Sequence, residues 1–316
     1  MKILRNGPSM RGIKGPVITL GNFDGIHAGH RLILRKVAER ARRLGSPSAV
    51  YTFEPHPMKV VSPLRCPPLI LDSEDKKALI KALGIDLLVL ARFTKEFAAL
   101  HPREFVEDVL VKGLNVREVW VGRSFSFGKG KLGTVDYLKE LGSEFGFKVY
   151  IIPPYKMGGR VVSSSRIRGL INEGSVAEAA RLLGREFSIK GLVVKGKEVG
   201  VEIGFPTANL KVASELIPRD GVYAGRAVID NRRYMAAVNI GTAPTFGGKG
   251  RTVETHIIGF RKNIYGKKMR VEFLRRLRDE KEFKSKEALV RQIQRDVQRV
   301  KTLIKTNQII KEISCG

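Results

Sequence analysis

Two histidines, His27 and His30, follow a short apolar run in the segment VITLGNFDGIHAGHRLILRKV, residues 17–37. The run predicts a buried strand, its glycines predict a tight turn, and the residues from His30 onward predict an amphipathic helix. Imidazoles three residues apart at a helix start lie on one face, where free N–H groups and a partial positive charge attract anions. Gly29 leaves room for a phosphate to approach the backbone. This spacing suits chemistry at a nucleotide phosphate.

The alternative is that the two histidines only cap the helix or pack against it. We favour a binding role because the pair stands at a strand–turn–helix junction, where open α/β sheets bind their ligands. The polar residues of the turn, Asn22 and Asp24, either fix its shape or contact the ligand directly, and both roles stay open.

A second anion-binding segment is VVSSSRIRGLI, residues 161–171. Serine hydroxyls and free N–H groups before a helix suit a phosphate, and arginine binds phosphates with two parallel hydrogen bonds. The alternative is a serine-rich cap with surface arginines. The nearby loop VGRSFSFGKGKLGT, residues 121–134, contains a formal G-x-G-x-x-G, which we reject as a dinucleotide fingerprint because two prolines, not an acid, follow the next strand.

A different chemistry is indicated by the hexapeptide GFPTAN, residues 204–209. Thr207 and Asn209 lie two apart, so in an extended segment both side chains point the same way. A hydroxyl and an amide oxygen are ligands that suit Mg²⁺ bound together with ATP phosphates. An ordinary polar turn is the alternative. Glu254 is the acidic residue of the run RTVETHII and could serve as a base or lie on a strand surface.

Composition limits the class of protein. The 316 residues are enough for two domains, and two distant cysteines argue against a disulfide framework and fit a reducing cytoplasm. The N-terminus lacks the apolar core of a signal peptide, and no run is long enough to span a membrane. Bases outnumber acids by 58 to 31, a net charge of +27 that favours anionic ligands in general.

The pattern of elements changes near residue 184. Before it, strands expected at 17–20, 49–53, 87–90, 116–121 and 148–152 alternate with helices expected at 30–44, 76–83 and 102–111. This alternation predicts a Rossmann-like parallel sheet. Ser175 and Glu178 predict a capping box for a short helix that Gly184 ends. From residue 189 to 273, short strands with a hairpin turn at Asp230–Asn231 predict an antiparallel β-barrel, followed by a C-terminal helix with Ser285 as N-cap.

The strings GNFDGIHAGH, VVSSSRIRG and VGRSFSFG resemble the adenylyltransferase half of bifunctional bacterial riboflavin kinase/FMN adenylyltransferases, also called FAD synthetases. GFPTAN, PRDGVYAG, NIGTAPTF and VETHIIGF resemble the riboflavin kinase half. Ser165 replaces the usual Thr, and Ser124 the usual Asp or Asn. The resemblance implies two cytoplasmic domains, an adenylyltransferase at 1–184 and a kinase at 185–316, which use ATP and Mg²⁺ to convert riboflavin to FMN and FMN to FAD.

The resemblance also implies a role for each residue of these motifs. The implied catalytic residues are His27, His30, Arg168 and Glu254; the implied nucleotide-binding residues are Gly21, Asn22, Phe23, Asp24, Gly29, Ser164 and Ser165; the implied flavin-binding residues are Ser124 and Phe125; and the implied metal ligands are Thr207 and Asn209. Glu254 would accept the proton of the riboflavin hydroxyl.

Two other functions compete with this interpretation. One is a riboflavin kinase whose adenylyltransferase domain is weakened, which the Ser124 departure suggests. The other is a basic nucleic-acid-binding protein, although aromatic residues are only 7% of the chain and no readout motif is present. We therefore expect riboflavin, FMN and ATP as ligands, with neither nucleic acid nor membrane as partner. The oligomeric state is left open.

Overall fold

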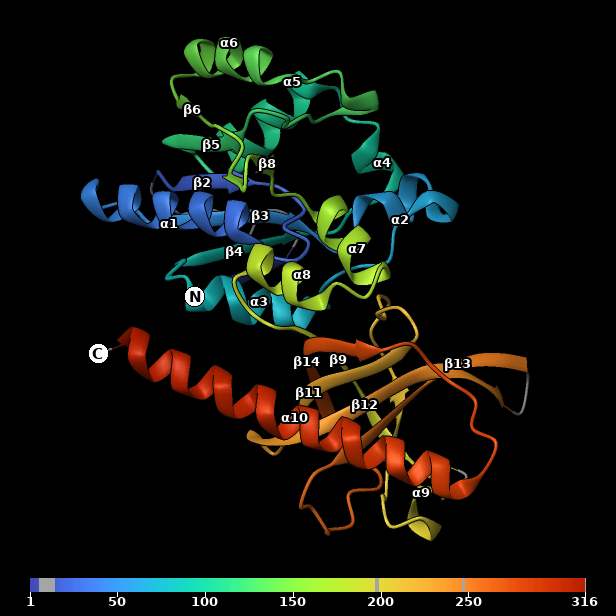
Figure 1. The fold of residues 1–316 in the computed structure, drawn as a ribbon. Helices are drawn as coiled ribbons and strands as arrows, with labels where there is room; N and C mark the ends of the chain where they lie inside the picture. Colours follow the sequence, from blue (N-terminus) through green and yellow to red (C-terminus); the bar gives the residue numbers. More distant parts are fainter. Residues whose placement is uncertain (6–14, 197–198, 246–247, 316) are drawn as a thin grey trace. The chain divides into compact units, whose positions relative to one another are not determined.

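The computed structural model describes residues 1–5, 15–196, 199–245 and 248–315. Contacts divide the chain into two compact units, Met1–Ser164 and Ser165–Gly316 (Figure 1). This division lies before the boundary expected at residues 184 and 185, because helices α7 (Ser164–Asn172) and α8 (Val176–Leu183) are counted almost wholly with the second unit. Helix α8 contacts strands of that unit.

The described residues of the first unit form a six-stranded sheet in the order β1-β4-β3-β2-β5-β6. All five strand pairs are parallel. The strands are β1 (Lys2–Arg5), β2 (Val17–Leu20), β3 (Ser48–Phe53), β4 (Leu87–Ala91), β5 (Glu118–Gly122) and β6 (Lys148–Ile152). The strand order reverses between β2 and β5, so the carboxyl ends of these two strands flank a topological switch point. The parallel sheet is confirmed, and β1 is an edge strand that the sequence did not reveal.

Two hydrophobic clusters cover the two faces of this sheet. Helices α1 (Ala28–Arg43) and α3 (Ser73–Ala82) pack on one face through buried residues such as Leu34, Val37 and Ile80. Helix α6 (Val135–Phe145) and the π-helical segment Phe105–Gly113 pack on the other, as Figure 1 shows. The remaining short helices are α2 (Pro57–Val61), α4 (Lys95–Ala98) and α5 (Pro102–Glu104), and the strands β7 (Lys156–Met157) and β8 (Arg160–Val161) form a small hairpin.

Two local expectations differ from the structure. The helix expected at 102–111 is a short α-helical turn that continues as the π-helical segment Phe105–Gly113. The capping box expected of Ser175 and Glu178 is wrong, because the Ser175 side chain makes no capping hydrogen bond. The Glu178 carboxylate instead accepts a hydrogen bond from the Arg166 guanidinium at 3.1 Å, an ion pair between α8 and α7. Gly184 ends α8 in the left-handed conformation, as expected.

Six strands of the described second unit close into an antiparallel barrel in the order β10-β13-β12-β11-β14-β9. They are β9 (Phe187–Val194), β10 (Ala208–Val212), β11 (Gly221–Ile229), β12 (Arg232–Thr245), β13 (Gly248–Ile257) and β14 (Lys268–Arg278), and the short helix α9 (Val199–Glu202) precedes β10. Asp230 and Asn231 both have positive φ and form the two-residue hairpin turn that the sequence predicted. Residues that alternate along the strands, such as Val253 and Phe273, fill the interior.

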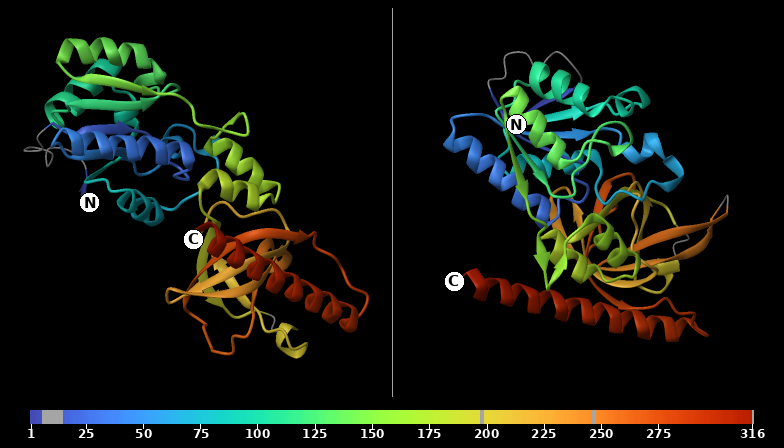
Figure 2. Two further views of the ribbon diagram at one scale, coloured as in Figure 1. Left: turned by 60° about the vertical axis from the view of Figure 1, so that its left-hand side comes forward. Right: turned by 90° about the horizontal axis from the view of Figure 1, so that it is seen from above.

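The C-terminal helix α10 (Lys286–Cys315) packs on the outer surface of the barrel (Figure 2). Ser285 caps it by accepting a hydrogen bond from the Ala288 amide at 3.2 Å. Val300 is fully buried in a cluster with Ala224 of β11. The buried Asp296 carboxylate pairs with the Arg278 guanidinium at 2.9 Å, so an ion pair also joins α10 to β14. The predicted N-cap is therefore confirmed, and α10 packs against the barrel.

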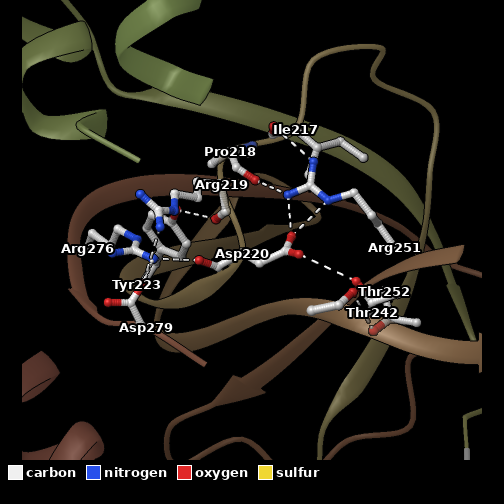
Figure 3. A network of polar contacts seen from close by, with 11 residues as sticks. Ile217, Pro218, Arg219, Asp220, Tyr223, Thr242, Arg251, Thr252, Arg276 and Asp279 are labelled. Carbon is white, nitrogen blue, oxygen red and sulfur yellow. Dashed lines mark hydrogen bonds and ion pairs between the residues drawn. The ribbon is translucent and has the colours of Figure 1, made fainter. Parts of the chain in front are cut away.

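A polar network at one end of the barrel joins the segment before β11 to residues of β12, β13 and β14 (Figure 3). The Asp220 carboxylate accepts hydrogen bonds from the Arg251 guanidinium, and the Asp220 carbonyl accepts one from Arg276 at 2.6 Å. The Arg219 amide donates to the Ile171 carbonyl at the end of α7. The Arg276 side chain also packs against Gly174, where an added Cβ would lie 2.5 Å from Arg276 Cδ.

Gly174→Ala should destabilise the second unit by about 1–3 kcal/mol more than Gly259→Ala, because overpacking adds to the shared backbone penalty. Both glycines have positive φ, but a Cβ at Gly259 would meet nothing within 4 Å. Urea unfolding followed by far-UV circular dichroism measures the difference, and fluorescence of Trp120, the single tryptophan, reports on the first unit as internal reference. Equal losses in both variants would contradict the packing argument.

Candidate active sites

The first site is built on the turn between β2 and α1. Phe23 and Ile26 have positive φ, which non-glycine residues seldom adopt, and their side chains are buried beneath the turn. His27 then takes an extended conformation as the N-cap of α1, and its carbonyl accepts the first helical hydrogen bond, from the Arg31 amide. The turn therefore delivers His27 to the N-terminus of a 16-residue helix at the carboxyl edge of the sheet.

His27 and His30 lie face to face above this helix start. Their ring centroids are 3.6 Å apart with planes inclined by 16°, and Phe23 packs edge-on against His30. His27 Nδ1 accepts a hydrogen bond from the His30 amide at 3.3 Å, so the proton of the neutral His27 ring is carried by Nε2. His30 Nδ1 is buried and has no hydrogen-bond partner in the described part of the chain. The pair is brought together as the sequence predicted.

The surroundings of His30 favour its neutral ring. Burial lowers the pKa of His30 well below its usual value, and the neighbouring His27 and the Lys76 ammonium lower it further. Each effect disfavours a second positive charge in a poorly solvated place. A bound phosphate would act in the opposite direction, because its negative charge would favour protonation of the His30 imidazole.

Gly29 stands against the His27 ring and Tyr155. An added Cβ would lie 3.3 Å from the His27 ring and 3.4 Å from Tyr155 Cβ. These contacts are tighter than ordinary packing, so glycine at this position lets the His27 ring lie flat over the helix start. Gly21, at the end of β2, has only the Phe23 ring within the same distance.

Two buried groups hold the turn from below. The Asp24 carboxylate, 4% exposed, accepts hydrogen bonds from the Ile70 and Leu71 amides at 3.0–3.2 Å. The Asn22 carbonyl accepts one from the Lys76 ammonium at 3.0 Å and one from the Thr52 hydroxyl at 3.3 Å. The carboxylate of Asp24 is therefore used inside the fold, which favours a turn-fixing role for it over direct contact with a ligand.

The serine-rich segment meets this turn through one residue. The Ser164 hydroxyl donates a hydrogen bond to the Asp24 carbonyl at 2.8 Å. Ser165 is exposed on the first turn of α7, and Arg168, half-buried, lies one turn further along α7 in the second unit. The Arg166 guanidinium pairs with the Glu178 carboxylate at 3.1 Å.

The loop after β5 carries Ser124 and Phe125 on the other side of the switch point. Ser124 is exposed, and the Phe125 ring stacks on Phe127 at a centroid distance of 5.6 Å. Phe127 continues a series of edge-to-face aromatic contacts that the sequence analysis missed. Its members are Phe105, Tyr51, Phe97, Phe53 and Phe93. These aromatic residues cluster because three separate strand ends meet at one edge of the parallel sheet. No local sequence pattern predicts this.

The second site lies on the outer face of the barrel. Asn209 of β10 is the direct cross-strand partner of Glu254 of β13, and Glu254 is in turn paired with Asn239 of β12. Paired residues of neighbouring strands point to the same face with Cβ atoms about 4.5–5.5 Å apart. All three are less buried than Val253 and Thr255, which fill the interior. The register thus brings Asn209 beside Glu254, and Thr207 lies two residues before Asn209.

Glycines and a histidine shape the bend in front of this row. An added Cβ at Gly196 would lie 2.0 Å from Asn209 Nδ2, and one at Gly200 would lie 2.4 Å from the Phe205 carbonyl. His256 Nδ1 donates a hydrogen bond to the Pro206 carbonyl at 2.9 Å, so this histidine holds the GFPTAN bend. The glycines and Asn239 are site-forming residues that the sequence analysis did not single out.

Comparison with known proteins gives matches to both halves of the chain. The family model described as FAD synthetase matches residues 10–166, and the model described as riboflavin kinase matches residues 183–304. The bifunctional riboflavin kinase/FMN adenylyltransferase of Escherichia coli (strain K12) is 35% identical over 299 residues, covering 94% of this chain and 96% of that protein. The protein of the same description from Pseudomonas fluorescens is 36% identical over 291 residues, or 92% and 93% of the two chains.

Among solved structures, the crystal structure of a macrolide-efflux protein from Streptococcus pneumoniae matches with a TM-score of 0.86 and 33% sequence identity. It covers 95% of this chain and 98% of that one, so the likeness extends over both compact units. Within the described residues, no helix has both the length and the apolar composition needed to cross a membrane.

The lowered pKa of His30 predicts how the stability of the first unit depends on pH. Below about pH 6.5 an unfolded histidine binds a proton that folded His30 does not, so unfolding becomes easier as the pH falls toward the lower folded pKa. In that pH window the free energy of unfolding of the wild-type protein should fall by up to about 1.4 kcal/mol per pH unit more than that of His30→Gln. Urea unfolding followed by Trp120 fluorescence measures this, with the exposed His101→Gln as control. Parallel curves for wild type and His30→Gln would contradict the prediction.

Proposed function

Because the chain belongs to the family of bifunctional riboflavin kinase/FMN adenylyltransferases, we propose that its two candidate sites divide the two reactions between them. The protein is an enzyme of flavin cofactor synthesis. It phosphorylates riboflavin with ATP to give FMN, and it transfers AMP from ATP to FMN to give FAD and pyrophosphate. In the proposal, residues 1–184 carry the adenylyltransferase and residues 185–316 carry the kinase.

In adenylyl transfer, a phosphate oxygen of FMN attacks the α-phosphorus of ATP and pyrophosphate leaves. The reaction needs positive charge and hydrogen-bond donors where negative charge develops. The observation that carries the proposal is the stacked pair His27 and His30 at the N-terminus of α1. The pair would bind the phosphates together with the amides of the helix start and gain protons as the anion arrives. No covalent intermediate with the protein is required.

The remaining nucleotide contacts are proposed from the motifs. Ser164 and Ser165 would donate to phosphate oxygens, and Arg168 would bind the leaving pyrophosphate. The Gly21–Asp24 turn and Gly29 would shape the nucleotide pocket, with Asp24 acting through its hydrogen bonds to the Ile70 and Leu71 amides. Ser124 and Phe125 would contact the flavin, whose flat ring suits the aromatic series around Phe127.

For the kinase reaction, the row Asn209–Glu254–Asn239 supports the assignment. Glu254 would accept the proton of the terminal ribityl hydroxyl as its oxygen attacks the γ-phosphorus of ATP. Asn239, beside Glu254, would orient that hydroxyl or the carboxylate. The direct register between these strands supports this assignment, because Asn209, Glu254 and Asn239 share one face of the barrel.

Mg²⁺ is proposed as the metal of the kinase reaction. The fit rests on the donor set, a hydroxyl from Thr207 and an amide oxygen from Asn209, and on Gly196, whose missing Cβ makes room for the Asn209 side chain. When bound, the ion would neutralise charge on the ATP phosphates. Glu254 still performs the proton transfer, and Thr207 and Asn209 hold the nucleotide end of the site.

From its composition, we also propose that the protein is cytoplasmic and that its ligands are the small molecules riboflavin, FMN and ATP. The competing function, a kinase with a weakened adenylyltransferase, is favoured by Ser124 alone. Chromatography of flavins after incubation with riboflavin, ATP and Mg²⁺ separates the possibilities, because FAD, FMN alone or neither would appear.

His30→Ala should lower FAD formation by about 10²–10³-fold while FMN formation continues at the wild-type rate. The reason is that the imidazole serves only the first site. Flavin chromatography measures both products in one reaction, and exposed His101→Ala is the matched control. Near-wild-type FAD output from His30→Ala would refute the assignment of the first site.

Glu254→Ala should slow riboflavin phosphorylation by about 10²–10⁴-fold, because the hydroxyl loses its proton acceptor. When FMN is supplied directly, the same variant should form FAD at the wild-type rate. Glu287→Gln, an exposed acid on α10, serves as control. Loss of both reactions in a folded Glu254→Ala protein would show that the two sites are not separate.

A further inference from the structure

Lys76 is a buried lysine that no motif of the sequence explains. It lies on the inward face of α3, only 9% exposed, one helical turn before the fully buried Ile80. Burying an ammonium group is costly unless hydrogen bonds or opposite charges compensate. Its immediate neighbour Lys77 instead reaches the surface carboxylate of Glu74 at 2.8 Å. Helix formation alone therefore does not explain why the Lys76 ammonium is buried.

The Lys76 side chain extends beneath the turn that bears the histidines. Its Nζ donates a hydrogen bond to the Asn22 carbonyl at 3.0 Å, in the turn that leads to the N-cap His27. Two residues of that turn, Phe23 and Ile26, have positive φ, so the turn needs outside contacts to keep its conformation. Lys76 is one of these contacts, and it comes from an element about fifty residues further along the chain.

The charge of Lys76 acts on the imidazole pair. The ammonium and the neighbouring His27 both disfavour protonation of His30, whose pKa is already lowered by burial. Burial also lowers the pKa of Lys76, while the carboxylates of Asp24 and Glu54 favour its charged form. The groups that face one another here are therefore two imidazoles, one ammonium and two carboxylates, drawn from the turn, α1, α3 and the end of β3.

A fixed buried cation beside neutral imidazoles is suited to receiving an anion. Before the nucleotide binds, the ammonium supplies positive potential without a charged histidine. Once phosphate oxygens arrive, they lower the cost of protonating the rings, so positive charge grows where negative charge develops. We propose that Lys76 is a positioning residue of adenylyl transfer, which holds the Asn22–His27 turn in its phosphate-binding shape and supplies a fixed positive charge beside the histidine pair. The proposal rests on the proposed function of the first site.

The test compares Lys76→Met, Lys76→Arg and Lys81→Met in the full-length enzyme. Methionine fills the same space without charge or donor, arginine keeps the charge, and Lys81 is an exposed lysine of the same helix. We expect Lys76→Met to lower the kcat for FMN adenylylation by about 10²-fold. We expect Lys76→Arg to retain more activity than Lys76→Met, and Lys81→Met to match the wild type. Riboflavin kinase activity of each sample should be unchanged, and fluorescence of Trp120 in β5 reports that the first unit is folded.

The second measurement is a histidine titration, which a purely structural lysine would not move. The ring signals of the five histidines are followed by NMR in the absence of nucleotide, and the signal missing in His30→Gln identifies His30. In Lys76→Met the His30 midpoint should move to higher pH, because one of the groups that disfavour its protonation is gone. In Lys76→Arg and Lys81→Met it should stay at the wild-type position.

Two results would overturn the inference. The first is FMN adenylylation by Lys76→Met within twofold of the wild type. The second is an unchanged His30 titration in that variant. These failures differ from failure of the proposed function, which would be seen as FAD formation by His30→Ala, whatever the Lys76 variants do.

Discussion

The first site depends on the hydrogen bonds made beneath the turn between β2 and α1. The Asp24 carboxylate binds the Ile70 and Leu71 amides, so the turn is joined to a segment more than forty residues away. A buried carboxylate without such partners would cost several kcal/mol, and the turn also carries unfavourable backbone conformations at Phe23 and Ile26. These contacts fix the position of His27, and the stacking of His30 on His27 follows from it. The N-terminus of α1 is thus held by polar contacts buried beneath the turn.

The second site relies on strand register instead of buried charge. Asn209 and Glu254 share a face of the barrel because β10 and β13 pair with these two residues opposite each other. A shift of one residue would turn the Asn209 side chain to the other face of β10. Gly196 leaves room for the Asn209 side chain, Gly200 permits a close approach of the Phe205 carbonyl, and His256 joins the bend before β10 to β13. The two sites are therefore sensitive to different changes. The first is sensitive to loss of buried polar groups, and the second to changes of packing near the barrel rim.

The sequence predicted what depends on neighbours along the chain. The strand Val17–Leu20, the helix after His27 and the hairpin at Asp230–Asn231 have local signals, and the structure confirms them. The missed features depend on distant partners. Lys76 looks in sequence like any helix lysine, and Asn239 becomes a neighbour of Glu254 only through the pairing of β12 with β13. The predicted capping box is wrong for the same reason. The Glu178 carboxylate pairs with the Arg166 guanidinium of α7 and not with the amide of the N-cap residue.

Helix α7 lies at the point in the chain where the two compact units divide. Ser164 ends the first compact unit, yet Ser165 and Arg168 of the same motif begin the second, where Gly174 packs against Arg276 and the Ile171 carbonyl binds the Arg219 amide. A fragment that ends at Ser164 would lose Ser165 and Arg168. A fragment that ends at Gly184 would keep them but would take from the barrel the helix α8, which packs on β14 and β9. Any cut that leaves Ser165 and Arg168 with the parallel sheet breaks α7 or removes from the barrel the hydrogen bond between the Ile171 carbonyl and the Arg219 amide.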